Sequence, residues 1–226
     1  MSKIPSDNTD LNRREVLAAA AAVTAHLVLP STLVKAQVST PATRQTRLDL
    51  DRFVQDCIAA SREDESQAAV LDVLARAVSD PKRMLAAVGE PSRAGISIIH
   101  RSESLTIFNA AWTPQMNLMP HNHLMWANIG IYTGREDNIF WSDSGNRMEA
   151  VGVQALFEGD AASLPADAIH SVTNPLLRFT GGIHIYGGDF FDTTRSQWDP
   201  ETLNEEPSDG DVIRRMFERE NQRLVI

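Results

Sequence analysis

His121–Gly134, with the sequence HNHLMWANIGIYTG, and Gly159–Asn174, with the sequence GDAASLPADAIHSVTN, are the two stretches that decide the fold. Both combine short apolar runs with glycine and asparagine, and the second also contains Pro165; these residues favour turns between strands. His121 and His123 stand two residues apart just before a predicted strand, so alternation along an extended chain places both imidazoles on one face. Such a pair can bind one ion. A lone pair of this kind is also common at a surface beside a proline turn.

Short apolar runs separated by turn residues continue on both sides of these stretches, over residues 91–192. They number seven or more, and this close spacing predicts a small β-barrel or sandwich. The runs are Gly95–His100, Leu105–Trp112, Met125–Tyr132, Asn138–Trp141, Gly152–Phe157, Ile169–Thr173 and Phe179–Tyr186.

Residues 48–90 precede the strands and show a helical pattern. Three helices are predicted there, the first with apolar residues spaced along a single face, the third beginning at Ser79-Asp80-Pro81. Cys57 lies on the first apolar face and is interpreted as a core residue. A charged helix is predicted at the surface over Asp211–Asn221, inside a C-terminal extension that covers residues 193–226.

The N-terminus resembles a twin-arginine export signal. Arg13 and Arg14 precede an uncharged apolar stretch over Ala18–Val34, and Val34-Lys35-Ala36 has the small residues that a signal peptidase favours. We therefore expect a signal peptide over residues 1–36, cleaved near Ala36-Gln37, and a flexible lead-in over residues 37–47. The twin-arginine export machinery would then deliver the folded protein to the periplasm. An uncleaved membrane anchor is the alternative.

Composition narrows the classes of partner. The formal net charge is −9 at pH 7, so nucleic acid and anionic membrane surfaces are poor partners, and no stable membrane association is expected once the signal is removed. The chain has one cysteine, which excludes an intramolecular disulfide and any cysteine-based metal cluster. Hydrophobic residues make up 42% and charged residues 23%, as in ordinary globular proteins.

The spacing within the two stretches resembles the two motifs of the cupin family. The first runs His121-x-His123, three residues, Ala127, six residues, Gly134, and the second runs Gly159, five residues, Pro165, one residue, Asp167, two residues, His170, three residues, Asn174. The resemblance implies a mainly β fold, the double-stranded β-helix or jelly-roll barrel, here preceded by a small helical segment. It also implies that His121, His123 and His170 bind a metal ion. Ala127 stands where many cupins carry a glutamate ligand, which leaves three neutral imidazoles.

Gly182–Phe190, with the sequence GIHIYGGDF, resembles a strand of the cysteine dioxygenase-type cupins that carries Ser-x-His-x-Tyr. Residues two apart share a face of a strand, so His184 and Tyr186 would both point into the barrel. The resemblance implies that the Tyr186 hydroxyl faces the metal-bound substrate and that His184 orients it. Gly182 stands at the position of the serine, so the hydrogen-bonded series of serine, histidine and tyrosine loses its first member here. The alternative is that His184 and Tyr186 are buried core residues whose polar atoms form hydrogen bonds with the backbone.

Substrate contacts leave a weaker trace in the sequence. The family's carboxylate-binding arginine lies on a strand before the first motif, and Arg101 is the nearest basic candidate, with a turn or surface arginine as the alternative. Gln115, on the approach to the metal motif, is a second candidate contact. Asn128 occupies the position of the cysteine that mammalian-type enzymes crosslink to the tyrosine, so this chain cannot form that crosslink.

These observations lead to one hypothesis and two alternatives. The leading hypothesis is a mononuclear non-haem iron(II) dioxygenase that oxidises a small thiol to a sulfinic acid with O2. The alternatives are a cupin enzyme that acts on another chelating metabolite and a non-catalytic metal- or ligand-binding cupin of the periplasm. Zinc, nickel and copper suit three histidines as well as iron does, and the oligomeric state is left open.

Overall fold

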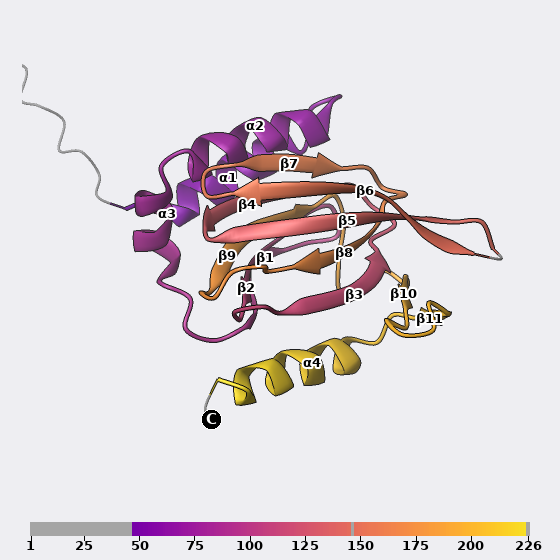
Figure 1. The fold of residues 1–226 in the computed structure, drawn as a ribbon. Helices are drawn as coiled ribbons and strands as arrows, with labels where there is room; N and C mark the ends of the chain where they lie inside the picture. The colour runs from indigo at the N-terminus through magenta and orange to yellow at the C-terminus, as the bar shows by residue number, and fades with distance from the viewer. Residues whose placement is uncertain (1–46, 146, 225–226) are drawn as a thin grey trace, which may run out of the picture. The chain divides into compact units, whose positions relative to one another are not determined.

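The computed structural model describes residues 47–145 and 147–224, which form four helices and eleven strands (Figure 1). The expected signal peptide and all of the lead-in except Arg47 lie outside these residues. The helices are α1 Leu50–Ala60, α2 Ser66–Val78, α3 Pro81–Val88 and α4 Gly210–Gln222. The strands are β1 Gly95–Arg101, β2 Thr106–Trp112, β3 Asn117–Asn122, β4 Ala127–Thr133, β5 Arg135–Asp143, β6 Met148–Phe157, β7 Ala161–Leu164, β8 Ile169–Thr173, β9 Thr180–Tyr186, β10 Ser196–Trp198 and β11 Glu205–Pro207.

The strands form two antiparallel sheets. One has five strands in the order β1-β2-β9-β4-β7, and the other has six in the order β11-β10-β3-β8-β5-β6. One cluster of buried side chains contains residues from both sheets, including Phe108, Ala127, Leu118 and Val172, so the sheets enclose a common core. The fold is thus the expected cupin-type double-stranded β-helix, preceded by a short helical segment.

Helices α1 and α3 begin at positions that favour a helix start. Asp49 caps α1 by accepting a hydrogen bond from the amide of Arg52 at 3.1 Å, and Asp80 caps α3 in the same way with Pro81 at its first turn. The three helices cover the outer face of the five-stranded sheet, where Cys57 is fully buried as expected. This helical layer therefore lies on the side of the sheet away from the common core (Figure 1).

Strand β3 corrects the sequence prediction at the first histidine pair. His121 and Asn122 are the last two residues of a strand, whereas the sequence placed them before one. The misleading signal is Pro120, which reads as a turn residue. The pairing of β3 with β8 shifts between Leu118 and His121, because proline has no N–H to donate to the ladder. The position of His121, directly opposite His170, is therefore fixed by the pairing of β3 with β8.

The C-terminal extension is more closely joined to the barrel than the sequence predicted. Strand β10 pairs with β3, so the larger sheet continues past residue 192. Helix α4 is charged on its outer side, as expected for a surface helix. Its other side buries Phe217 and Asn221, and Phe217 stacks on Trp112 with ring centroids 5.5 Å apart. The predicted surface helix is thus also a wall of the barrel core.

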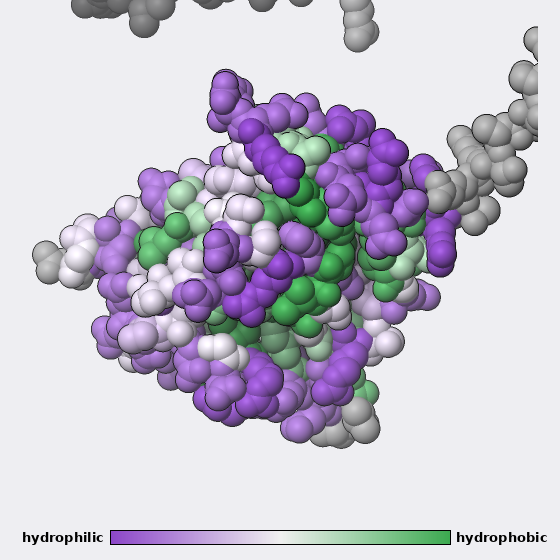
Figure 2. Space-filling model, turned by 180° about the vertical axis from the view of Figure 1, so that it is seen from behind, coloured by the Kyte–Doolittle hydropathy of each residue, from purple (hydrophilic) through white to green (hydrophobic). Residues whose placement is uncertain are grey.

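The face seen in Figure 2 carries a band of hydrophobic residues between more hydrophilic margins. Ile98 of β1 is among the large hydrophobic residues that the described part of the chain exposes.

No helix within the described residues is long and apolar enough to cross a membrane.

Candidate metal centre and cavity

Three histidines from the two motifs meet inside the barrel. His121 ends β3, His123 follows it, and His170 lies on the adjacent strand β8, where it pairs directly with His121. One ring nitrogen from each residue lies within 4.8 Å of the others, and all three side chains are buried. This is the arrangement that the two motifs imply. The pairing of β3 with β8 places His121 opposite His170, and His123 follows directly after the end of β3.

Hydrogen bonds orient two of the three rings. The Nδ1 atom of His121 lies 3.0 Å from the carbonyl oxygen of Met119, and Nδ1 of His170 lies 2.6 Å from Oδ1 of Asn138. Both partners accept, so each imidazole carries its proton on Nδ1 and keeps a lone pair on Nε2. Nε2 of His170 lies 3.1 Å from Nε2 of His123. Converging ring nitrogens with lone pairs fit a divalent metal ion.

The environment keeps these imidazoles neutral. Burial lowers the pKa of His121 from 6.5 to about 4. Burial also lowers the pKa values of His123 and His170 well below the ordinary value, with the neighbouring imidazoles as the next cause. A neutral imidazole is the form that binds a metal ion. Nδ1 of His123 is buried and has no hydrogen-bond partner among the described residues.

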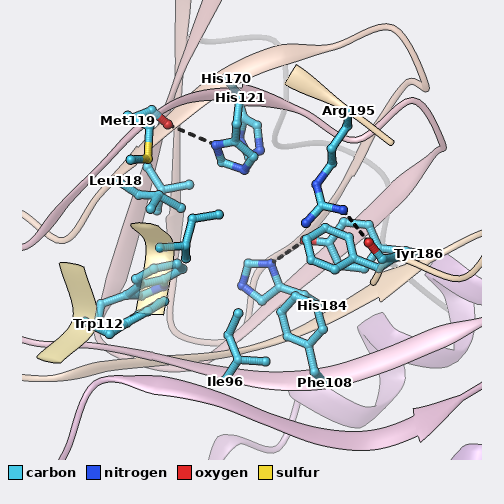
Figure 3. Close-up of a pocket in the computed structure, with 14 residues that line it drawn as sticks. Ile96, Phe108, Trp112, Leu118, Met119, His121, His170, His184, Tyr186 and Arg195 are labelled. Atoms are coloured by element: carbon cyan, nitrogen blue, oxygen red, sulfur yellow. Dashed lines mark hydrogen bonds between the residues drawn. The ribbon is translucent and has the colours of Figure 1, made fainter. Parts of the chain in front are cut away.

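A small cavity of about 50 Å³ adjoins His121 and His170. Figure 3 shows that His184, Tyr186 and Arg195 also face it, and apolar side chains form most of the remaining wall. These apolar residues are Ile96, Phe108, Trp112, Leu118, Met119, Val172, Phe190, Ile213 and Phe217. A cavity of this size accommodates only a small molecule.

Strand β9 directs His184 and Tyr186 to the inside of the barrel, as predicted from their spacing. The Tyr186 hydroxyl lies 3.5 Å from Nδ1 of His184, at the long end of hydrogen-bond range. The Tyr186 ring meets the ring of His123 edge to face, with centroids 4.9 Å apart. Burial raises the pKa of Tyr186, and the charge of Glu136 raises it further. Tyr186 is therefore a protonated hydroxyl at neutral pH.

Glu136 is a buried residue of this region that the sequence reasoning missed. It is the second residue of β5, but its side chain is fully buried and accepts hydrogen bonds from Trp112 Nε1 at 2.9 Å and Asn138 Nδ2 at 3.1 Å. Its Oε2 atom lies 3.3 Å from Nε2 of His184, an ion-pair distance without the alignment of a hydrogen bond. Glu136, Asn138 and Phe140 alternate along β5 and so share one face of the strand. This alternation could have identified Glu136 as an inward-facing residue.

Glu136 keeps its negative charge despite its position. Burial acts to raise its pKa, but the adjacent His184 imidazole and the hydrogen bonds from Asn138 and Trp112 outweigh burial and hold the pKa below the ordinary value. The site therefore contains a fixed carboxylate that is not one of the clustered ligands.

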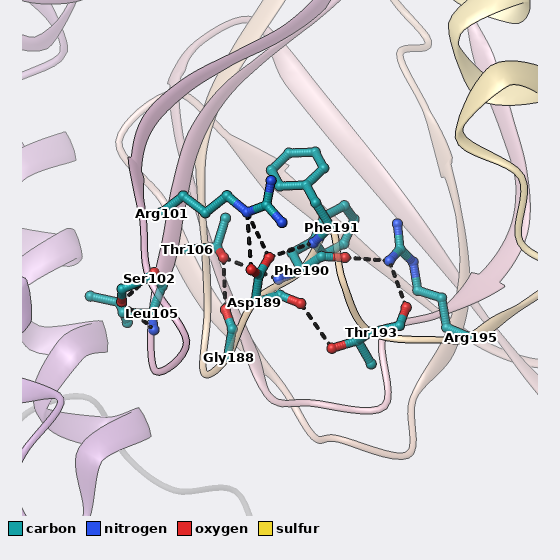
Figure 4. A network of polar contacts seen from close by, with 10 residues as sticks. All are labelled: Arg101, Ser102, Leu105, Thr106, Gly188, Asp189, Phe190, Phe191, Thr193 and Arg195. Atoms are coloured by element: carbon teal, nitrogen blue, oxygen red, sulfur yellow. Dashed lines mark hydrogen bonds and ion pairs between the residues drawn. The ribbon is translucent and has the colours of Figure 1, made fainter.

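Arg101 and Gln115 lie away from the cavity. Arg101 ends β1 at the surface, pairs with Asp189 at 2.8 Å and stacks over Phe191 (Figure 4). Gln115 is exposed in the turn between β2 and β3. Neither side chain lines the cavity. The structure thus places Arg101 in the surface position that the sequence reasoning kept as its alternative.

Arg195 supplies the guanidinium that does face the cavity. It lies on the segment between β9 and β10, stacks 3.9 Å above the Phe190 ring and donates to the carbonyl oxygen of Phe190 (Figures 3 and 4). Burial lowers the pKa of Arg195. The ion pairs within the described residues do not include it. No sequence motif identifies Arg195 as a site residue, because it lies C-terminal to the second motif, on a segment that returns to the cavity in the folded chain.

Two departures from the family pattern have clear structural settings. Ala127, at the glutamate position, faces the inner core and pairs with Tyr186 across β4 and β9, so β4 offers no ligand there. Asn128, at the position of the crosslinking cysteine, donates to the Gln67 carbonyl and accepts from Ser163. It thus contributes to the attachment of α2 and lies on the face away from Tyr186.

Comparison with known proteins returns similarity of structure only. No family model and no curated protein matches the sequence. A protein with a double-stranded β-helix domain from Klebsiella pneumoniae is 11% identical, with a TM-score of 0.36 over 53% of this chain and 88% of its own. An RmlC-like cupin family protein from Methanocaldococcus jannaschii is 10% identical, with a TM-score of 0.39 over 45% and 86%. A cupin superfamily protein from Desulfitobacterium hafniense is 16% identical, with a TM-score of 0.38 over 46% and 88%.

These values are low, so the fold assignment depends on the strand order itself. The chain has a cupin-type double-stranded β-helix whose interior brings together three buried histidines able to hold a metal ion.

Proposed function

We propose that this protein is an iron(II)-dependent dioxygenase that oxidises a small thiol bearing an anionic group to the sulfinic acid. The reaction is balanced without a further reductant: the thiol RSH and O2 give RSO2H, with both oxygen atoms on sulfur. One observation carries the proposal. The cavity beside the three histidines also holds the Tyr186 hydroxyl and the Arg195 guanidinium.

The ligand set supports a metal that binds and activates small molecules. His121, His123 and His170 would hold the ion, and the absence of a carboxylate at Ala127 leaves its charge at 2+. Bound iron(II) would supply positions for the thiolate and for O2.

The chain's own residues would select and orient the substrate. Arg195 is positioned to pair with an anionic group, and its charge already acts on the pKa values of His121 and Tyr186. Tyr186 presents its hydroxyl to the cavity, and His184, whose Nδ1 lies 3.5 Å away, limits how that hydroxyl turns. The apolar wall excludes water, which strengthens both interactions.

The test is O2 uptake by the iron-loaded protein in the presence of cysteine, 3-mercaptopropionate or cysteamine. One O2 should be consumed for each sulfinate formed. Arg195→Gln should lower kcat/KM for the two carboxylated thiols by roughly 100-fold, as expected for loss of a buried charge pair, and spare cysteamine. Tyr186→Phe should retain the iron and slow turnover by roughly 10²–10⁴-fold.

Arg101→Gln is the matched control, since it removes an exposed guanidinium that pairs with Asp189 outside the cavity. Its kinetics should follow those of the unchanged protein. If no thiol in this panel couples to O2 uptake, thiol oxidation is wrong. Oxidation of a different chelating anion would then identify the first alternative enzyme, and stoichiometric metal without turnover would favour plain binding.

We also propose that the protein is exported by the twin-arginine machinery, on the basis of Arg13, Arg14 and the apolar stretch that follows them. Replacement of both arginines by lysine should retain the precursor in the cytoplasm, because the export receptor reads the arginine pair rather than charge alone. Unchanged periplasmic yield of a protein that begins at Gln37 would contradict this assignment.

A further inference from the structure

Glu136 connects two parts of the site that lie on different strands. Its Oε1 atom accepts from Asn138 Nδ2 at 3.1 Å, and Asn138 Oδ1 lies 2.6 Å from Nδ1 of His170. Its Oε2 atom accepts from Trp112 and lies 3.3 Å from Nε2 of His184. One buried carboxylate thus reaches a candidate metal ligand through one oxygen atom and the Tyr186 partner through the other.

The first arm determines which nitrogen of His170 faces the metal position. An ionised carboxylate only accepts hydrogen bonds, so the amide of Asn138 must turn its NH2 group toward Glu136 and its oxygen atom toward His170. That oxygen atom requires a proton on Nδ1 of His170. The Nε2 lone pair is then free, on the side where His123 lies 3.1 Å away.

The second arm acts on His184 by the same logic. Oε2 of Glu136 attracts the N–H of His184 to Nε2, so the opposite nitrogen, Nδ1, keeps its lone pair. The Tyr186 hydroxyl lies 3.5 Å from that lone pair. Gly182 occupies the position of the serine that the family pattern places in this relay, and Glu136 approaches the imidazole from another strand.

We propose that Glu136 is a positioning residue that sets the tautomers of His170 and His184 together, and so prepares the metal position and the Tyr186 hydroxyl at once. The Tyr186 arm rests on the proposed function. The His170 arm needs only that the three histidines bind a metal ion, so the two can fail separately.

The test compares Glu136→Gln with Asp137→Asn. Both changes remove a carboxylate from β5 without a change of size, but the Asp137 carboxylate pairs with Arg135, and no hydrogen bond or ion pair of the described residues joins it to a histidine. Imidazole tautomers are measured by long-range ¹H–¹⁵N NMR of the metal-free protein. Zinc affinity is measured by titration calorimetry. The midpoint of thermal unfolding establishes whether each variant folds.

Glu136→Gln should convert His170 and His184 from single tautomers to mixtures, because a glutamine side chain can present either an acceptor or a donor to each arm. Zinc affinity should fall 10–100-fold, the usual cost of losing a ligand's hydrogen-bonded support. Asp137→Asn should leave both measurements unchanged. Single tautomers and zinc affinity within twofold in folded Glu136→Gln would overturn the proposal.

Asn138→Ala tests the His170 arm separately from the His184 arm. It also keeps the proposal testable if Glu136→Gln does not fold. It removes the only side-chain link between Glu136 and His170 recorded in the described residues. His170 should lose its single tautomer while His184 keeps Nε2–H. A change at both histidines, or at neither, would overturn the two-arm scheme. Because no readout here depends on thiol turnover, failure of the proposed reaction and failure of this inference give different results.

Discussion

The two faces of strand β9 belong to two different cores. Ile183 and Ile185 point outward and pack under the helices with residues such as Cys57 and Leu74. His184 and Tyr186, the residues between and beyond them, point inward to the histidine cluster. A strand alternates its side chains, so one short segment serves both.

The outer core is almost entirely apolar and tightly packed. A Cβ atom added at Gly130 would meet Leu74 at 2.9 Å, so β4 and α2 approach as closely as glycine permits. The inner core instead contains the buried polar groups of Glu136, Asn138 and His170, each with a partner. An unpaired buried polar group costs about 1–3 kcal/mol, so the inner core holds its geometry only while its partners are complete. Both faces of the sheet are packed, but the buried polar groups of the candidate site lie on the inner face alone.

The sharpest test of this division is His170→Ala. Loss of one of three protein ligands should lower zinc affinity by roughly 1000-fold, or about 4 kcal/mol, as inferred from the total binding energy of zinc sites. The outer core should stay intact, so near-native helical circular dichroism is expected. Titration calorimetry measures the affinity. Stoichiometric metal at unchanged affinity would show that His170 is not a ligand.

Ile185→Ala is the reciprocal variant on the outer face. Ile185 is fully buried, so its truncation should lower the free energy of unfolding by about 3 kcal/mol. Zinc affinity of the folded variant should remain within twofold of the unchanged protein, because the side chain points away from the cavity. Urea unfolding measures the first quantity. A parallel loss of metal would mean that the two faces are coupled.

Asn221→Ala tests how α4 closes the inner core. The Asn221 side chain accepts from the Ala94 amide at 2.7 Å and donates to its carbonyl at 2.9 Å, both in buried surroundings. Their loss should cost about 1–3 kcal/mol and speed hydrogen exchange along α4. Arg215→Ala, on the exposed side of α4, is the control and should change stability by less than about 0.5 kcal/mol. Equal behaviour of the two variants would argue against the closure.

The smallest expected effect is the contribution of Cys57 to the pH dependence of the free energy of unfolding. Burial raises its pKa from 9.0 to about 12, with the charge of Asp56 adding to the shift. The folded state then holds the thiol proton more tightly than the unfolded state does, so this contribution is complete below pH 9 and is lost as the pH rises toward 12. At pH 10 the loss should be about 1 kcal/mol.

The matched variant is Cys57→Ala, which removes the titrating thiol. Urea unfolding at pH 8 and pH 10 should show the extra loss in the unchanged protein and not in this variant. Superimposable pH profiles would mean that the thiol titrates alike in the folded and unfolded chains.

The parts of the fold that the sequence predicted well are those with a local signal. Asp80-Pro81 marked the start of α3, and alternation along β9 placed His184 and Tyr186 on the inner face. Strand β3 was obscured by Pro120, and β7, β10 and β11 are too short to leave a periodic pattern. Short elements are stabilised by their neighbours rather than by their own residues, so local patterns do not reveal them.

The sequence by itself indicated a small β-barrel and the His121, His123 pair, and its resemblance to the two cupin motifs added the cupin-type fold and His170. The direct pairing of His121 with His170 across β3 and β8 is the physical basis of that motif spacing. Only the tertiary structure decided that Glu136 and Arg195 join the site and that Arg101 does not. Glu136 comes from the strand beside His170, and Arg195 from a segment that returns after the last long strand. Their proximity is set by the closure of the barrel, which links positions far apart in the chain and has no periodic trace along it.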